Sequence, residues 1–333
     1  MNLTINHMLN LAVKALQENR LEEAEEKFKK LIELKPDYFL AHYNLGNTLY
    51  ILKKFDEALI YFQKTLELNP EFPSVLVNLA NTLKKLHRFD ESIEIYKKII
   101  KLEPDNEHLH RNFDIIIGQK KLISKILKSK ESNYKFNKSS INSVNLRSSS
   151  SDFRLISNPF ISNRAVETEL ITELYKINTR KLEEGNKIQK KDARYGNGLC
   201  SDFQLFKNDS IILKKVAESL TKIIEEAVKS EIFIMDSFFN ILKAGSGSRP
   251  HAHENEFDID SGLIKQKYSL TYYLSVGDQN CSEPGHLKLY DPKQEVLVSE
   301  GKIVIIPATR KHSAKYGGKT DRIMIGVNFY IIN

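Results

Sequence analysis

The feature that most constrains this chain is a pattern that recurs every 34 residues through its first hundred positions. The prolines Pro36, Pro70 and Pro104 are separated by this interval. Small, aromatic and amide side chains keep the same register in three copies: Ala12, Gly46 and Ala80; Ala24, Ala58 and Ser92; Phe28, Phe62 and Tyr96; Asn10, Asn44 and Asn78. A period of this length predicts a stack of similar supersecondary units.

Each unit is expected to be a pair of antiparallel helices. The small residue of the first helix should face the small residue of the second, because short side chains let two helix backbones approach closely. Each proline ends a second helix, since it cannot continue the hydrogen-bond ladder. These residues resemble the tetratricopeptide repeat over about residues 4–104. A further helix, from Glu107 to about Leu127, is expected to cap the array.

The resemblance to tetratricopeptide repeats implies a surface for a protein or peptide partner. In this repeat family the first helices line a concave surface that binds an extended peptide or a partner helix. Asn10, Asn44 and Asn78 lie on the expected first helices and are the candidate partner-binding residues. The alternative is that they are polar residues on a hydrated helix face. The repeats themselves carry no catalytic chemistry.

A basic, serine-rich segment separates the repeats from the rest of the chain. Residues 118–154 contain nine Lys or Arg and two acidic residues, which accounts for the whole net charge of +7. Residues 139–151 include seven serines and show no hydrophobic periodicity, so they cannot bury enough apolar area to offset chain entropy. We therefore predict three parts: repeats with a capping helix in 1–117, a linker in 118–152, and a second domain in 153–333.

Composition and charge exclude several classes of protein. No stretch approaches the length of apolar sequence that spans a membrane, and the N-terminus lacks the pattern of a signal peptide. Two cysteines, Cys200 and Cys281, do not make a disulfide framework and are expected to be reduced thiols. Positive charge concentrated in a linker favours a solvated tether over a nucleic-acid groove. The expected location is cytoplasmic, with no membrane or nucleic-acid partner.

The last hundred residues are typical of an all-β domain. Residues 210–230 have the apolar spacing of a helix, and short apolar runs separated by Gly, Pro, Asp and Asn follow from Glu231 onward. The runs cover residues 232–242, 268–275, 286–290, 295–299, 302–308 and 322–332. Six or more strands at this spacing predict a sandwich or barrel. Residues 153–230 are expected to supply a helix and outer strands that cover it.

Three of the nine histidines fall at the edges of the expected strands: His251, His253 and His312. Two residues at positions i and i+2 can point to the same side of a strand. Imidazole is a good ligand for divalent transition metals, iron among them. Arg322 follows the third histidine by ten residues. This group of residues favours a metal site over isolated structural histidines.

The histidines and Arg322 belong to a second resemblance, which covers about 90 residues. The order and spacing of five elements resemble the prolyl-hydroxylase branch of the 2-oxoglutarate/Fe(II) dioxygenases: Gly245-x5-His251, Tyr272-Tyr273-Leu-Ser, Gly285-His-Leu-Lys-Leu-Tyr, Gly301-Lys-Ile-Val-Ile-Ile-Pro and His312-x9-Arg322. The resemblance implies a double-stranded β-helix, a jelly roll of two antiparallel sheets. It also implies Fe(2+) as cofactor, with 2-oxoglutarate and O2 as co-substrates.

By the same resemblance, individual residues acquire roles. His251 and His312 correspond to the first and last iron ligands of the family, and Arg322 corresponds to the residue that pairs with the far carboxylate of 2-oxoglutarate. Tyr273 matches a tyrosine whose hydroxyl assists that arginine, although it is equally an ordinary strand aromatic. Both would be cofactor-binding residues.

The sequence departs from the family pattern at one metal ligand. Where the family has Asp or Glu two residues after the first histidine, this chain has His253. His253 is the third ligand in one interpretation. In a second, Glu254 or Glu256 supplies the carboxylate, and in a third, water fills the position. The sequence alone leaves all three open.

The expected function is that of an Fe(II)- and 2-oxoglutarate-dependent dioxygenase that hydroxylates a protein or peptide recruited by the repeats. Two alternatives remain at this stage. One is a non-catalytic scaffold or binding protein with a degenerate oxygenase barrel, and the other is an oxygenase that acts on a small metabolite. Arg322 favours an enzyme, because a barrel without activity has no use for a co-substrate anchor.

Overall fold

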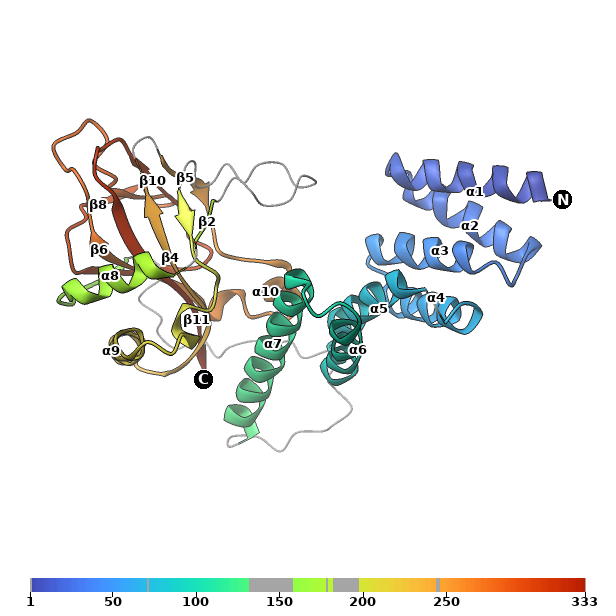
Figure 1. The fold of residues 1–333 in the computed structure, drawn as a ribbon, viewed down its shortest axis with the longest axis horizontal. Helices are drawn as coiled ribbons and strands as arrows, with labels where there is room; N and C mark the ends of the chain where they lie inside the picture. The colour runs from blue at the N-terminus through green and yellow to red at the C-terminus, as the bar shows by residue number, and fades with distance from the viewer. Residues whose placement is uncertain are drawn as a thin grey trace. The chain divides into compact units, whose positions relative to one another are not determined.

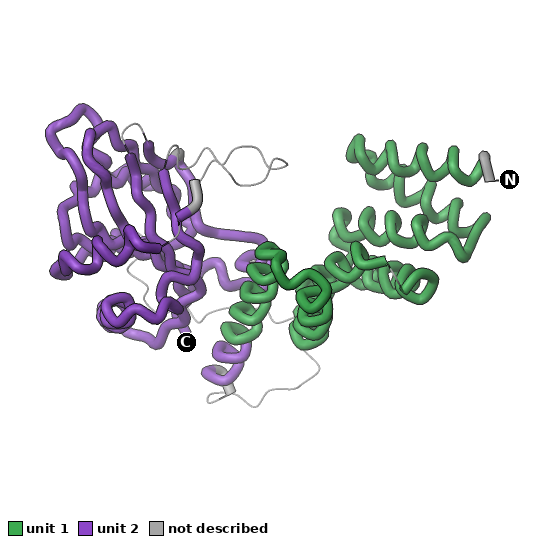
Figure 2. The backbone as a smooth tube through the Cα atoms, in the orientation of Figure 1, with its two compact units in different colours: residues 1–123 green, residues 124–333 purple. Residues whose placement is uncertain are grey.

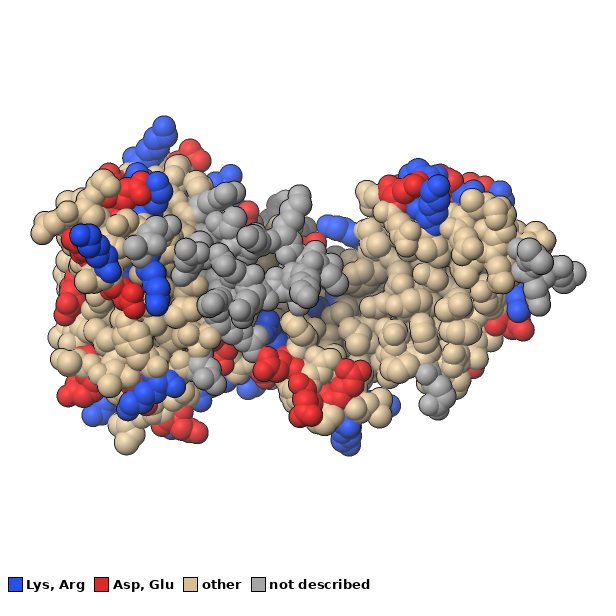
Figure 3. Space-filling model, turned by 45° about the horizontal axis from the view of Figure 1, so that its top comes forward, with Lys and Arg blue, Asp and Glu red and all other residues tan. Residues whose placement is uncertain are grey.

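A computed structural model describes residues 2–70, 72–131, 158–177, 179–181, 198–243 and 246–332. The chain forms two compact units, Met1–Ile123 and Ser124–Asn333 (Figure 2). The first is helical and the second is rich in strands (Figure 1). Basic and acidic side chains are interspersed on the face of each unit drawn in Figure 3.

The first unit consists of helix pairs with the predicted period. Its helices are α1 (Asn2–Gln17), α2 (Leu21–Leu34), α3 (Phe39–Ile51), α4 (Phe55–Leu68), α5 (Pro73–Lys85) and α6 (Phe89–Leu102), followed by α7 (Glu107–Glu131). Helices α2, α4 and α6 each end two residues before the repeated proline. The prediction of a helical repeat array is confirmed.

The small residues of each pair pack as expected. The repeated small positions of both helices are buried, as are the three aromatic residues Phe28, Phe62 and Tyr96. In the third pair the Ser92 hydroxyl donates a hydrogen bond of 2.7 Å to the backbone oxygen of Ala80. That bond joins the two small positions directly, which shows how closely the helix backbones approach.

Helix α7, expected from Glu107 to about Leu127, crosses the predicted boundary at residue 118. The linker was expected to begin at residue 118, whereas α7 remains helical through Glu131. Its apolar residues Ile116, Leu122 and Ile126 are buried, so the helical periodicity continues across the predicted boundary and the basic residues occupy its other faces. The serine-rich segment 139–151 and the predicted start of the second domain at Phe153 lie outside the described residues.

The second unit contains two antiparallel sheets. The larger has the strand order β1-β9-β6-β11-β4-β3-β2 and the smaller has the order β5-β10-β7-β8. The strands are β1 (Phe160–Asn163), β2 (Arg180–Lys181), β3 (Leu199–Cys200), β4 (Glu231–Leu242), β5 (Ser246–His251), β6 (Lys267–Ser275), β7 (Leu287–Leu289), β8 (Gln294–Val296), β9 (Lys302–Pro307), β10 (His312–Tyr316) and β11 (Arg322–Ile332).

The two faces of the larger sheet have different neighbours. One face packs against helices α8 (Thr168–Lys176) and α9 (Ile211–Val228) in an apolar core that includes Leu220, Ile224, Phe239, Leu270 and Ile325. Residues next to these in the strands, such as Asn240 and Thr271, line a cavity on the other face together with residues of the smaller sheet. Strand alternation therefore separates a structural face from a cavity-lining face.

The predicted strands agree with the structure, except that two strands of the smaller sheet were not predicted. All six apolar runs contain strands, and the helix predicted at 210–230 is α9. The described residues between 158 and 230 supply edge strands of the larger sheet, as expected, and two helices where one was expected. Strands β5 and β10 were not predicted as strands, because their sequences, SGSRPH and HSAKY, have no run of apolar residues.

Candidate metal centre

The three histidines are brought together by two different elements. His251 is the last residue of β5 and His312 is the first residue of β10. These strands are hydrogen-bonded neighbours, and His251 and His312 are direct partners across the ladder. His253 lies two residues beyond β5, where its backbone N–H donates to the oxygen of Ala308 at 2.8 Å.

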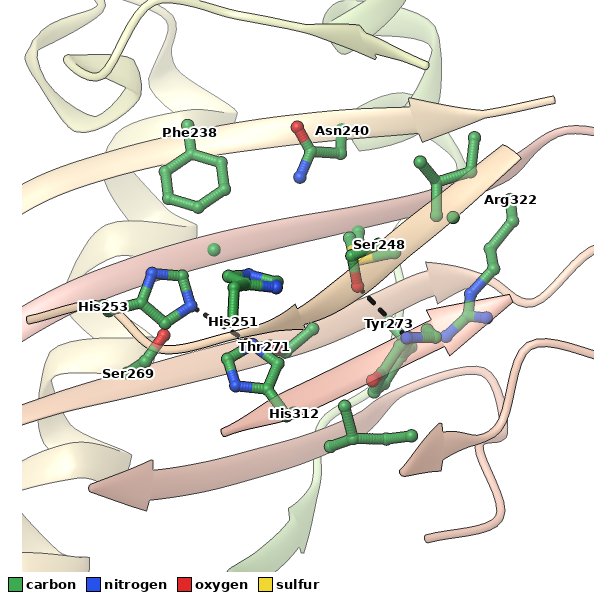
Figure 4. Close-up of a pocket in the computed structure, with 16 residues that line it drawn as sticks. Phe238, Asn240, Ser248, His251, His253, Ser269, Thr271, Tyr273, His312 and Arg322 are labelled. Carbon is green, nitrogen blue, oxygen red and sulfur yellow. Dashed lines mark hydrogen bonds between the residues drawn. The ribbon is translucent and has the colours of Figure 1, made fainter. Parts of the chain in front are cut away.

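The imidazoles converge closely enough to share one ion. One ligand atom from each of His251, His253 and His312 lies within 4.8 Å of the others. The ring centroids are 4.4 Å apart for His251 and His312, 4.9 Å for His253 and His312, and 5.2 Å for His251 and His253. The Nε2 atoms of His253 and His312 are 3.2 Å apart. Figure 4 shows these rings grouped at one end of a cavity.

His312 is held in the state that a metal requires. Its Nδ1 lies 3.1 Å from the backbone oxygen of Arg310, so Nδ1 carries the proton and Nε2 offers a lone pair to the cluster. Burial and, to a smaller extent, the charge of His251 together lower the pKa of His312 to about 4, against the opposing effect of the Arg310 carbonyl. The ring is therefore neutral at pH 7.

The cavity beside the histidines lies between the two sheets. Its volume is about 60 Å³. A single water needs roughly 10–15 Å³ of such volume, so several waters or a small ligand can enter. The lining residues come from six strands and the segment after β5: Phe238, Asn240, Leu242, Gly247, Ser248, His251, His253, Ser269, Thr271, Tyr273, Leu287, His312, Ala314, Arg322, Met324 and Gly326.

Arg322 is a buried cation without an acidic partner among the described residues. Its side chain is 0% exposed, and its Nε and Nη2 atoms have no hydrogen-bond partner. Its Nη1 donates to the backbone oxygen of Gly285. Burial lowers the pKa of the guanidinium, which indicates how unfavourable the isolated charge is. An anion in the cavity would satisfy such a group.

Tyr273 and Gly285 hold the Arg322 side chain in place. The guanidinium carbon lies 5.0 Å from the centre of the Tyr273 ring, and its positive charge opposes the rise that burial causes in the tyrosine pKa. Gly285 has φ +82°, and a Cβ there would overlap Arg322 Nη1. A side chain at position 285 would therefore displace the guanidinium, which explains the glycine.

No carboxylate joins the histidine cluster among the described residues. Glu254 and Glu256, the alternatives for the third ligand, are exposed. Glu256 begins helix α10 (Glu256–Asp260), which Asn255 caps. Among the described residues, the fold brings His253, and neither Glu254 nor Glu256, into the group with the other two imidazoles.

The cavity also contains residues that sequence reasoning missed. Asn240 is buried and its Oδ1 has no hydrogen-bond partner, and in Figure 4 its amide lies over the cavity. Met324 pairs with Asn240 on β4 and with Tyr273 on β6, so these three residues form one row across the sheet. The alternation of side chains along β4, β6 and β11 could have placed Asn240 and Met324 on the same face as Tyr273.

The candidate partner-binding asparagines differ in their surroundings. Asn10 is exposed. The Asn44 amide donates to the Leu40 oxygen of its own helix at 2.7 Å. The Asn78 amide donates to Asn47 Oδ1 at 2.7 Å and to the Tyr43 hydroxyl at 3.2 Å, which ties α5 to α3. Partner binding by these residues stays a prediction.

Comparisons with known proteins identify the first unit. Family profiles for the tetratricopeptide repeat match residues 39–72 and 73–106, and a profile for the TPR repeat matches residues 15–52. The N-terminal repeats are tetratricopeptide repeats. No helix among the described residues is long and apolar enough to cross a membrane.

Solved structures match about a third of the chain. A point mutant of MamA is 27% identical, with a TM-score of 0.33, and covers 34% of this chain and 67% of its own. YrrB, described as a TPR protein with an unusual peptide-binding site, is 21% identical, with a TM-score of 0.32, and covers 38% and 67%. The first TPR of Spaghetti (RPAP3) bound to an HSP90 peptide is 19% identical, with a TM-score of 0.32, and covers 34% and 89%. No curated protein matched the sequence.

Proposed function

We propose that the second unit is an Fe(II)- and 2-oxoglutarate-dependent dioxygenase of the double-stranded β-helix type, and that it hydroxylates a protein or peptide recruited by the repeats. The observation that carries this proposal is a single cavity that contains three converging imidazoles and one buried guanidinium without an acidic partner among the described residues. The two antiparallel sheets on either side of the cavity agree with a jelly roll.

The residues at the cluster fit a divalent transition metal. His251, His253 and His312 offer three imidazole nitrogen donors from positions close enough to share one ion. Imidazole donors suit Fe(II), and three protein ligands on an octahedral ion leave three positions for co-substrates. When bound, the iron supplies the capacity to activate O2. The protein holds the ligand rings in place through the Arg310 carbonyl and the β5–β10 ladder.

Arg322 fits one carboxylate of 2-oxoglutarate. The free Nε and Nη2 atoms offer two donors side by side, the geometry of a two-point carboxylate pair. The ring of Tyr273 lies against the same guanidinium. The histidines and Arg322 line the same cavity, so a short dicarboxylate can reach both.

The repeats support a protein or peptide as the partner. Helix α3 carries no Asp, Glu, Lys or Arg, and α1 carries only Lys14. In α5 the only charges are Lys84 and Lys85 in the last turn. The first helices of such repeats line the concave surface, so a partner there meets an uncharged surface with asparagine amides. We propose Asn10, Asn44 and Asn78 as contacts of this partner.

A non-catalytic binding protein is the second candidate. The observation in its favour is that the cluster contains no carboxylate among the described residues, whereas the resembling oxygenases have one. Such a protein would bind a metal and a small anion without turning over. An oxygenase that acts on a small metabolite is also compatible with this cavity.

The deciding experiment is conversion of 2-oxoglutarate to succinate by purified protein with Fe(II) under air. We expect succinate to form slowly without a prime substrate and to require Fe(II). A His251→Ala, His312→Ala double variant serves as the control that removes two donors. If wild type binds Fe(II) and 2-oxoglutarate and yields no more succinate than this control, the dioxygenase proposal fails and the binding protein remains.

A further inference from the structure

The three histidines of the cluster are held by different parts of the fold. His251 and His312 are direct partners in the smaller sheet, so the β5–β10 ladder fixes both. His253 follows β5, and its backbone bonds to Ala308, the residue after strand β9 of the larger sheet. Something other than the β5–β10 ladder must therefore fix the third imidazole.

A buried ion pair lies next to the His253 segment. The Nζ of Lys267 lies 2.8 Å from Oδ2 of Asp258, and the two residues are 3% and 0% exposed. The Tyr330 hydroxyl donates to the other carboxylate oxygen of Asp258. An ion pair without access to water needs all its remaining hydrogen bonds satisfied, and replacing it by apolar residues is often neutral for stability. Its presence therefore calls for a role beyond stability.

Hydrogen bonds connect this ion pair to the backbone segment that carries His253. The backbone N–H of Asn255 donates to Asp258 Oδ2 at 2.8 Å. The backbone N–H of Ala308 donates to the oxygen of Lys267 at 2.9 Å, and Ala308 in turn accepts from the backbone of His253 at 2.8 Å. The segment from His253 to Asn255 is thus pinned at both ends to the first residue of β6, once through Ala308 and once through the carboxylate.

We propose that Asp258, Lys267 and Tyr330 are positioning residues that set the third metal ligand, His253, while His251 and His312 are set independently by the smaller sheet. The inference rests on the proposed metal centre. In this proposal, the buried ion pair makes the metal site one of three imidazoles instead of two. Position 253 supplies an imidazole only when the segment that carries it is held against the larger sheet.

The test counts imidazoles on a bound metal ion. Cu(II) is added to full-length protein, and pulsed electron paramagnetic resonance reports the number of coordinated imidazoles. We expect three in wild type and two in Asp258→Asn, the same as in His253→Ala. Metal affinity in Asp258→Asn should fall by roughly 10-fold or more, as for loss of a residue that orients a ligand. Lys267→Met combined with Asp258→Asn, which removes both charges, covers the case in which the single variant does not fold.

A double-mutant cycle separates positioning from a general loss of structure. Adding Asp258→Asn to His253→Ala should cause no further loss of affinity, because the ligand that it positions is already absent. Adding it to His312→Ala should cause the full loss. Asp236→Asn is the matched control: this carboxylate, also on the larger sheet, bonds Asn328 at 2.7 Å instead of the His253 segment. It should retain three imidazoles.

Two results would overturn different claims. If wild type coordinates no imidazole at all, the metal centre proposed above is wrong. If wild type coordinates three imidazoles and both Asp258→Asn and the charge-free double variant still coordinate three with unchanged affinity, the metal centre stands. In that case the ion pair is structural only.

Discussion

Replacing Arg322 with methionine should have opposite effects on stability and on ligand binding. In the free protein the buried guanidinium has two atoms without partners, and burial of an uncompensated charge costs several kcal/mol. Against this stand the hydrogen bond to Gly285, worth about 1 kcal/mol, and the contact with the Tyr273 ring, worth up to about 2 kcal/mol. Methionine fills a similar space without charge. We expect Arg322→Met to raise the free energy of unfolding by roughly 1 kcal/mol.

Ligand binding should change in the other direction. A charge-assisted, two-point pair with a carboxylate is worth several kcal/mol when it is desolvated, so the variant should bind 2-oxoglutarate at least roughly 100-fold more weakly, or about 3 kcal/mol. The assay is chemical denaturation with and without 2-oxoglutarate, in the presence of Mn(II) to avoid turnover. At about 100 times its dissociation constant, the ligand should stabilise wild type by about 2.7 kcal/mol and the variant hardly at all.

The reasoning about Arg322 is refuted by either of two results. If Arg322→Met strongly destabilises the free protein, the guanidinium is satisfied within the fold and has no need of an anion. If 2-oxoglutarate stabilises the variant as much as wild type, its carboxylate binds elsewhere. Tyr273→Phe, which keeps the ring and removes the hydroxyl, is the matched control and should lose about 10-fold in affinity.

Three further predictions concern Gly285, the third metal ligand and Asp236. Gly285→Ala should weaken 2-oxoglutarate binding about as much as Arg322→Met, because a Cβ at position 285 would overlap the guanidinium. Calorimetry measures the affinity. An affinity equal to that of wild type would mean that the backbone at position 285 moves to accommodate the methyl group. Glu254→Ala should leave metal affinity within about 2-fold while His253→Ala lowers it roughly 10-fold, and the reverse order would assign the third ligand to the carboxylate. Burial raises the pKa of Asp236 to about 6, so this carboxyl favours the folded state below about pH 4 and loses that contribution as pH rises to about 6. Asp236→Asn should therefore stabilise the protein at about pH 7.5 by about 2 kcal/mol, and a variant less stable than wild type would contradict the burial argument.

The repeats could be predicted almost completely from the sequence, because their contacts are local. Each small residue meets its counterpart about twelve positions away, as Ala80 and Ser92 do, so the period that reveals the repeat also reveals the packing. The end of α7 was less clear. Its basic residues suggest a solvated tether, yet Leu122 and Ile126 continue the buried stripe of the helix.

The candidate site was harder to predict because its contacts are distant in sequence. His251 and His312 are 61 positions apart and meet through two strands that have no apolar pattern. Their clustering could be expected from family resemblance, whereas the complete burial of Arg322 and its unpartnered atoms could not. The contacts that join Asp258, Lys267 and Ala308 to His253 had no signal in the sequence, since an acidic residue within a short helix is usually exposed.

The absence of a carboxylate among the described ligands changes the role of Arg322. In a site with two histidines and a carboxylate, the protein itself offsets one charge of a divalent ion. Three neutral imidazoles offset none, and Arg322 adds a further positive charge to the same cavity. If the proposed metal centre is correct, ligands from solution would have to supply the negative charge, and a 2-oxo dicarboxylate could do so with one carboxylate for the metal and the other for the guanidinium. Metal and dicarboxylate should consequently bind with strong positive coupling, each raising the affinity of the other by the same factor.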